Sequence, residues 1–332
     1  MPPIQTVKLG HVETLALENS VLVEGDVRQA LALLPSESIQ CAVTSPPYWG
    51  LRDYGIAGQI GLETGLADFI GSLVSIFSEV RRVLRPDGVL WLNIGDGFTS
   101  GNRGWRAPDK KNPNRAMGTR PDNPPGLKDK DLLGVPWRLA FALQQDGWYL
   151  RSEIIWHKPN AMPESVKDRP TRCHEHLFML TRSERYHYDA HTVRERAEDG
   201  TWRNRRSVWS INTEPSRGGH IAPFPRHLVA PCIQSSSRPG DFVMDPFCGS
   251  GTVGVVAHAL GRRFLGIELN PGYLNVARAA IIGLGTSKPR NPIPYANEPI
   301  STPALLEPPG RTRKRTRPIA QASTPRGTRR NA

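Results

Sequence analysis

Short apolar runs alternate along this chain with segments in which apolar residues recur every three or four positions. The runs Val21–Glu24 and Ile39–Thr44 are short, rich in β-branched residues and followed by turn residues, which predicts strands. Residues 69–84 carry apolar side chains on one helical face and stop before Pro86-Asp87-Gly88, which predicts a helix that ends there.

The same pattern continues to about residue 284. It predicts further strands over residues 89–93, 149–156, 176–181, 242–244 and 264–268, and further helices over residues 132–145, 226–236, 252–260 and 271–284. Strands that alternate with helices in this way predict a mostly parallel sheet with helices on both faces, so the expected fold class is α/β.

Two segments do not follow this pattern. Residues 286–332 are rich in Pro, Ser and Thr and poor in large apolar residues, which is typical of a disordered tail. Residues 99–131 form a long insertion with Gly, Pro and Asn punctuation and an excess of basic residues. We therefore expect one folded domain over residues 1–285, interrupted by a basic loop and followed by a basic, Pro-rich tail.

Charge adds a preference for polyanions. The 332 residues carry a net charge of +12, and the tail holds ten of the basic residues against two acidic ones. Lys and Arg release counterions from phosphates, so the tail is either a nucleic-acid contact or a solubilising segment. In the insertion, Arg103, Lys110 and Lys111 can follow a nucleic-acid backbone, and the alternative is a solvated loop.

Other features exclude several classes of protein. No apolar run is long enough to span a bilayer, and the first residues lack an export signal, so we expect a cytoplasmic protein without membrane contact. The four cysteines form no CxxC pair, and the spacing of Cys173, His174 and His176 matches no common zinc pattern, so no metal is expected. Cys232 is interpreted as a small buried residue rather than a nucleophile.

A glycine-rich turn indicates a cofactor that contains adenosine. The sequence from Gly249 to Gly254 matches GxGxxG between a predicted strand and a predicted helix, and Glu268 follows nineteen residues after the first glycine. This pattern alone fits a dinucleotide, another adenosine cofactor or a purely structural turn. Asp245, just before the turn, would repel a pyrophosphate but suits the ammonium group of a methionine moiety, which favours S-adenosylmethionine over NAD.

The strand at 39–44 runs into Ser45-Pro46-Pro47-Tyr48, at the edge where α/β proteins place their chemistry. The Ser45 hydroxyl and the Pro46 carbonyl offer two acceptors for the two N–H groups of an exocyclic amine, and the prolines restrict the backbone. Tyr48 offers a flat ring to a base taken out of its duplex. The alternative is a Pro-rich turn with a core aromatic residue.

TSPPYW together with DPFCGSGT resembles the exocyclic-amino DNA methyltransferases, the N4-cytosine and N6-adenine enzymes, in the circularly permuted group whose catalytic loop precedes the cofactor loop. The resemblance covers most of residues 20–285 and implies a Rossmann-like, S-adenosylmethionine-dependent methyltransferase fold. It implies Asp26 near the adenine, Glu268 on the ribose and Phe224 on the pocket wall. The full set of cofactor residues expected is Asp26, Phe224, Asp245, Phe247, Gly249, Gly251, Thr252 and Glu268.

The resemblance also implies the substrate. A serine in the first motif position is more typical of N4-cytosine enzymes, so cytosine N4 in double-stranded DNA is favoured over adenine N6. Residues 186–220 occupy the place of a target-recognition region, with Arg203, Arg205 and Arg206 as DNA contacts. A companion restriction endonuclease is a candidate partner, the alternative being an enzyme without one, and the protein is expected to be a monomer or homodimer. The alternative from another class is a DNA-binding module that has lost catalysis. Asp96 is expected to cap a loop rather than to remove a proton.

Overall fold

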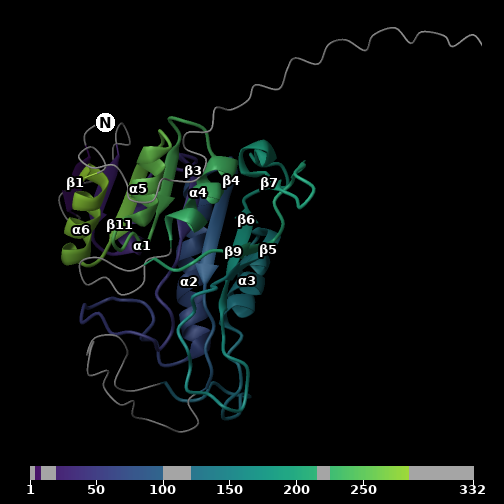
Figure 1. Cartoon of the computed structure of the whole chain (residues 1–332). Coiled ribbons are helices and arrows are strands. Elements are labelled where there is room, and N and C mark those ends of the chain that lie inside the picture. Colours follow the sequence, from purple (N-terminus) through teal and green to yellow (C-terminus); the bar gives the residue numbers. More distant parts are fainter. Residues whose placement is uncertain (1–3, 9–19, 100–120, 215–224, 284–332) are drawn as a thin grey trace, which may run out of the picture. The chain divides into compact units, whose positions relative to one another are not determined.

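The computed structural model describes residues 4–8, 20–99, 121–214 and 225–283. Within these residues, nine strands form one sheet in the order β1–β2–β11–β10–β3–β4–β6–β5–β9 (Figure 1). The strands are β1 Gln5–Lys8, β2 Val21–Glu24, β3 Ile39–Thr44, β4 Leu84–Ile94, β5 Tyr149–His157, β6 His174–Thr181, β9 Val208–Ser210, β10 Phe242–Asp245 and β11 Arg263–Glu268. The α/β fold expected from the sequence is confirmed.

One strand of this sheet runs against all the others. The pairs from β1 to β4 are parallel, and β5 pairs in parallel with β9. β6 is antiparallel to both of its neighbours, β4 and β5. The amino end of β6 therefore lies at the same edge of the sheet as the carboxyl ends of the other strands.

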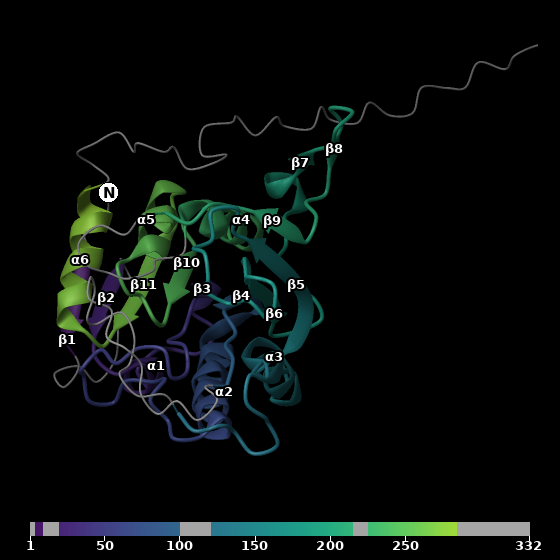
Figure 2. The same cartoon turned by 60° about the horizontal axis from the view of Figure 1, so that its bottom comes forward.

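Helices cover both faces of the sheet (Figure 2). The helices are α1 Val27–Ala32, α2 Leu66–Val83, α3 Val135–Gln145, α4 Arg226–Ser236, α5 Thr252–Ala259 and α6 Pro271–Ile282. Side chains alternate across each strand: Val21 and Val23 of β2 belong to the core beneath α1, α2 and α3, whereas Leu22 belongs to the core beneath α4, α5 and α6. Two separate apolar cores therefore hold the sheet from both sides.

Two predicted boundaries were wrong for local reasons. The helix expected to reach Pro86-Asp87-Gly88 ends at Val83, and β4 begins at Leu84, which pairs with Ile39 of β3. The register then shifts, so residues 85–88 form an irregularity within the strand rather than a helix stop. The helix expected from residue 132 begins at Val135, because Gly134 has a left-handed φ of 69° and Pro136 occupies the first turn.

The segment between β6 and β9 contains a short helix and a small hairpin. These are η2 Ala190–Val193, β7 Glu195–Arg196 and β8 Trp202–Arg203. The His187 amide donates to the Asp87 carbonyl near the start of β4, and the Asp189 amide donates to the Ser235 carbonyl near the end of α4. The segment is therefore attached at the edge of the sheet opposite to the end of β3. Among the described residues, no helix has the length and apolar character needed to cross a membrane.

Candidate active site

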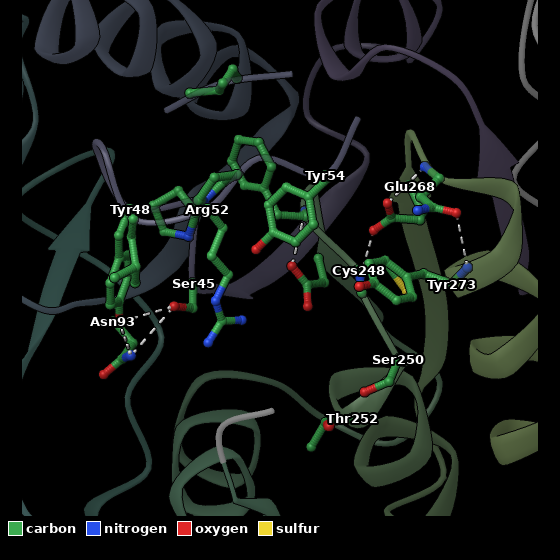
Figure 3. Close-up of a pocket in the computed structure, with 18 of the residues that line it drawn as sticks. Ser45, Tyr48, Arg52, Tyr54, Asn93, Cys248, Ser250, Thr252, Glu268 and Tyr273 are labelled. Atoms are coloured by element: carbon green, nitrogen blue, oxygen red, sulfur yellow. Dashed lines mark hydrogen bonds between the residues drawn. The ribbon is translucent and has the colours of Figure 1, made fainter. Parts of the chain in front are cut away.

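The two loops singled out in the sequence lie side by side. β3 and β10 are neighbours in the sheet, so the loop after Thr44 and the turn after Asp245 leave the same edge. The Thr44 hydroxyl donates to Asp245 Oδ1 at 2.7 Å and links the last residues of the two strands. A cavity of about 810 Å³ opens at this edge, lined by residues of both loops (Figure 3). Such a volume is within the range of cofactor sites.

Glu268 ties the glycine turn to the start of α6. Its Oε2 accepts from the Gly249 amide at 2.8 Å, and its Oε1 accepts from the Asn270 amide at 2.8 Å. Burial raises the pKa of this carboxyl above its usual range. Glu268 lies at the carboxyl end of β11 and lines the cavity, as its predicted role at a ribose requires.

The turn itself depends on Gly251. This residue has a left-handed φ of 81° and stands directly before α5. A Cβ atom here would lie 2.8 Å from the Ala277 Cβ of α6, so a larger residue would push the two helices apart. Gly249 and Thr252 of the same turn line the cavity.

Asp245 is the most deeply buried acid of the site, with 1% of its surface exposed. Its Oδ1 accepts both the Thr44 hydroxyl and, at 3.1 Å, the Phe247 amide. Burial raises the pKa of Asp245 to about 7, because it disfavours the ionised form more strongly than these hydrogen bonds favour it.

Asp26 and Phe247 are two further residues that were predicted to contact the cofactor. Asp26 is the N-cap of α1, where it accepts from the Arg28 amide at 2.8 Å and pairs with the Arg28 guanidinium. Burial opposes ionisation, but hydrogen bonds from Arg28 lower the pKa of Asp26 overall. Phe247 packs edge to face on Phe77 of α2. Both residues line the cavity, whereas Phe224 falls outside the described residues.

At the other end of the cavity, Ser45 and Tyr48 meet two residues that were not predicted. Asn93 of β4 directs its Nδ2 at the Ser45 hydroxyl, 3.4 Å away, and at the Tyr48 hydroxyl, 3.2 Å away (Figure 3). The Tyr48 hydroxyl donates to Glu175 Oε2 at 2.8 Å. Pro46 and Pro47 line the cavity beside them. The four residues of the predicted catalytic loop are thus brought together.

Glu175 enters the site because β6 is antiparallel. Its other oxygen accepts from the Lys158 ammonium, which also lies 4.2 Å from the centre of the Trp156 ring. Burial alone would raise the pKa of Glu175, but the charge of Lys158 and the hydrogen bonds from Lys158, Asn93 and Tyr48 lower it overall. The available sequence signals were a lone polar residue, Asn93, in the apolar run VLWLNI and an acid, Glu175, between two histidines just before the apolar run LFML.

The other side chains considered in the sequence have local roles. Asp96 accepts from the Val135 amide at the start of α3 and lies 3.6 Å from Arg172, which confirms its capping role. Cys232 is fully buried in α4, which confirms it as a core residue. His176 contacts Glu153 at 2.6 Å. Within the described ranges, no group of three His, Cys, Asp or Glu residues is arranged to hold a metal.

None of the predicted DNA contacts in the described residues lines the cavity. Arg203 pairs with Glu195 in the β7–β8 hairpin, and Arg205 stacks on Trp209 at the sheet edge. The Arg206 carbonyl accepts from the Trp209 indole. Among the described residues of the expected target-recognition region, Thr213 and Glu214 line the cavity. Arg103, Lys110 and Lys111 lie outside the described residues.

Comparisons with known proteins agree with this geometry. The model of the DNA methylase family, which groups N6 and N4 methyltransferases, matches residues 39–279. The chain is 62% identical over 285 residues to the Type II methyltransferase M.Cfr9I of Citrobacter freundii, covering 86% of this chain and 95% of the relative. It is 56% identical over 268 residues to the Type II methyltransferase M.SmaI of Serratia marcescens, covering 80% of this chain and 92% of the relative.

Solved structures support the same fold. The PvuII DNA methyltransferase (cytosine-N4-specific) superposes with a TM-score of 0.61 at 19% identity, over 84% of this chain and 88% of that one. A putative DNA modification methylase from Thermus thermophilus, solved with S-adenosyl-L-methionine, superposes with a TM-score of 0.54 at 26% identity, over 78% of this chain and 92% of that one. Because the family match spans most of the chain and covers both loops of the cavity, this protein belongs to the DNA methylase family of N6 and N4 exocyclic-amino methyltransferases.

Proposed function

We propose that this protein transfers a methyl group from S-adenosylmethionine to the N4 amino group of a cytosine that is flipped out of double-stranded DNA. The observation that carries the proposal is the single cavity shared by the Ser45 loop and the glycine turn, whose strands are linked by the Thr44–Asp245 hydrogen bond. Cytosine is favoured over adenine because Ser45 holds the first motif position and Trp49 follows Tyr48, a combination more typical of N4 enzymes.

The residues at the end of the cavity next to the glycine turn fit S-adenosylmethionine. The buried acid Asp245 and the half-buried acid Glu268 line the part of the cavity next to the glycine turn, and the hydrogen bonds described for them come from backbone amides and Thr44. An anionic pocket of this kind suits an ammonium group and a ribose diol, and it disfavours a pyrophosphate. When bound, the cofactor supplies an electrophilic methyl group on a sulfonium.

The residues at the Ser45 end hold the amine. The Ser45 hydroxyl and the Pro46 carbonyl each accept one N–H of the exocyclic amino group, so the nitrogen moves toward tetrahedral geometry and its lone pair leaves conjugation with the ring. Tyr48 stacks on the flipped base. The two ends of the cavity align the nitrogen and the methyl group, which lowers the entropic part of the barrier.

The test is to incubate the protein with mixed-sequence duplex DNA and S-adenosylmethionine and to identify modified nucleosides by mass spectrometry. We expect N4-methylcytosine. N6-methyladenine would keep the family and overturn the choice of base. Binding of both cofactor and DNA without any modified base would favour a DNA-binding module that has lost catalysis.

We further propose that the modification occurs at one DNA sequence and protects that sequence from a companion restriction endonuclease. The relatives with high identity are named Type II methyltransferases, which supports this proposal. A plasmid modified by this protein should resist one specificity among a panel of Type II endonucleases and remain sensitive to the others. Sensitivity to the whole panel, with modified bases scattered among unrelated sequences, would contradict it.

A further inference from the structure

A buried chain of polar groups lies directly behind Ser45. Glu175 has only 17% of its side chain exposed, and its two carboxylate oxygens receive three donors. Oε2 accepts from the Tyr48 hydroxyl and the Asn93 amide, each at 2.8 Å, and Oε1 accepts from Lys158. The methyl transfer proposed above does not by itself require this carboxylate.

The carboxylate determines which group donates to which. An ionised carboxylate can only accept, so the Tyr48 hydroxyl must give its hydrogen to Glu175. The Tyr48 oxygen is then an acceptor, and two donors face it: the Asn93 amide at 3.2 Å and the Ser45 hydroxyl at 3.4 Å. Catalytic hydrogen bonds of this length commonly shorten when the substrate binds.

This direction matters because a serine hydroxyl can donate or accept. Once its hydrogen points at Tyr48, Ser45 has two lone pairs, one facing Asn93 Nδ2 and the other remaining for a substrate N–H. We propose that Glu175, held by Lys158, fixes the donor direction of the Tyr48–Ser45 hydrogen bonds and thereby makes Ser45 an acceptor for the amino group of the target base. Glu175 is then a positioning residue, and the inference rests on the role proposed for Ser45.

The orientation of Asn93 supports this arrangement. The Asn93 amide nitrogen, rather than its oxygen, must face Glu175, because two acceptors would repel each other. One of its two N–H groups serves Glu175, and the other is shared between the Ser45 and Tyr48 oxygens. The hydrogen-bond directions of Asn93, Tyr48 and Ser45 therefore all follow from the negative charge of Glu175.

Lys158 keeps that charge in place. Its side chain is 18% exposed and is held between Glu175 and the Trp156 ring, so the ion pair is largely shielded from water. The other titratable groups that interact with Glu175 are Tyr48 from the β3 loop and His174 from β6, which also interacts with Arg172. Lys158 contributes the largest favourable charge to the ionised carboxylate.

The first test replaces the carboxylate by an amide of the same shape. In Glu175→Gln, the new NH2 group can donate to the Tyr48 hydroxyl and so reverse the direction of the hydrogen bonds between residue 175, Tyr48 and Ser45. We therefore expect kcat to fall at least about tenfold, while KM for DNA and the Kd for S-adenosylmethionine stay unchanged. Glu153→Gln is the matched control, since Glu153 is a partly buried acid on the adjacent strand that contacts His176 instead. A wild-type kcat in Glu175→Gln would overturn the inference.

The second test uses pH, which a purely structural role would not affect. Because Lys158 lowers the pKa of Glu175, Lys158→Met should raise it, so the loss of kcat on acidification should begin at a higher pH than in the wild type. An unshifted acid limb in Lys158→Met would overturn the inference.

A third measurement separates direction from packing. Tyr48→Phe keeps the aromatic ring but removes the hydroxyl that links Glu175 to Ser45. The effects of Tyr48→Phe and Glu175→Gln on kcat should therefore not add in the double variant. Additive effects on kcat would contradict the inference. The double variant can be compared with the single variants even if one of them has a lowered melting temperature, as long as each is folded at the assay temperature. A wild-type protein that methylates no exocyclic amine would instead refute the proposed function itself.

Discussion

At Ser45, chemistry and cofactor binding should be separable. The hydroxyl lies at the opposite end of the cavity from Glu268 and the glycine turn. Ser45→Ala removes one of the two acceptors for the amine, and losing one such preorganised group costs roughly 100-fold in kcat. Single-turnover methylation and calorimetric titration of S-adenosylmethionine measure the two effects. Equal losses of rate and cofactor affinity would show that Ser45 acts on the cofactor pocket instead.

Asp245 should make cofactor affinity depend on pH. Burial disfavours its ionised form and raises its pKa to about 7, whereas an ammonium group nearby would favour the ionised form. Below pH 7 the cofactor must displace a proton from Asp245, so its affinity should rise from pH 5.5 to pH 7, by up to about tenfold per pH unit. Titrations across this range test it, and the dependence should disappear in Asp245→Asn. A pH-independent affinity in the wild type would place the ammonium group elsewhere.

Among the elements, α5 is sensitive to a single methyl group. In Gly254→Ala the new Cβ would lie 2.6 Å from Ile281 Cδ1 and 2.7 Å from the Phe264 ring, and such overpacking costs about 1–3 kcal/mol. Gly71→Ala in α2 is the matched control, since a Cβ there meets nothing within 4 Å and the helix should gain about 0.5–1 kcal/mol. Thermal melts should move in opposite directions, and a common direction would contradict the packing described for α5.

The strands and helices show what the sequence pattern can and cannot predict. The parallel strands around the site, β3, β10 and β11, were predicted because apolar β-branched runs followed by turn residues lead to Ser45, Asp245 and Glu268. Glu175 was not predicted, because the rule that site residues follow strands applies to parallel strands. β6 is antiparallel, so its first residues reach the site, and its direction is decided by pairing with β4 and β5, which no local pattern records.

The same limit applies to the expected target-recognition region. Its arginines and its length could be predicted from the sequence. The position of Arg203 could not, because the segment begins where the antiparallel strand β6 ends, at the edge of the sheet opposite to the cavity. The proximity of Asn93 and Lys158 to Ser45 likewise follows from the order of strands in the sheet. Local chemistry could thus be predicted from the chain, whereas contacts across strands required the fold.

For the whole molecule, the charge of the tail should govern DNA affinity at low salt. Residues 286–332 carry ten basic and two acidic residues, a large part of the net charge of +12. A chain ending at residue 285 should bind duplex DNA with a shallower salt dependence, by about 0.9 in the log–log slope for each phosphate that the tail neutralises. Binding curves at several salt concentrations measure this slope. The single-turnover rate constant of methylation on saturating DNA is the control and should not change. Identical slopes in the two proteins would show that the tail does not contact the DNA phosphates.

The Thr44–Asp245 hydrogen bond joins residues that are 201 positions apart in the chain. The active site therefore depends on two strands being neighbours, and it does not depend on which of them is synthesised first. The first described strand, β1, pairs with β2, and the last helix, α6, packs against β2 as well. A gene in which these ends are joined and the chain is opened between the two loops would encode the same cavity with its motifs in reverse order.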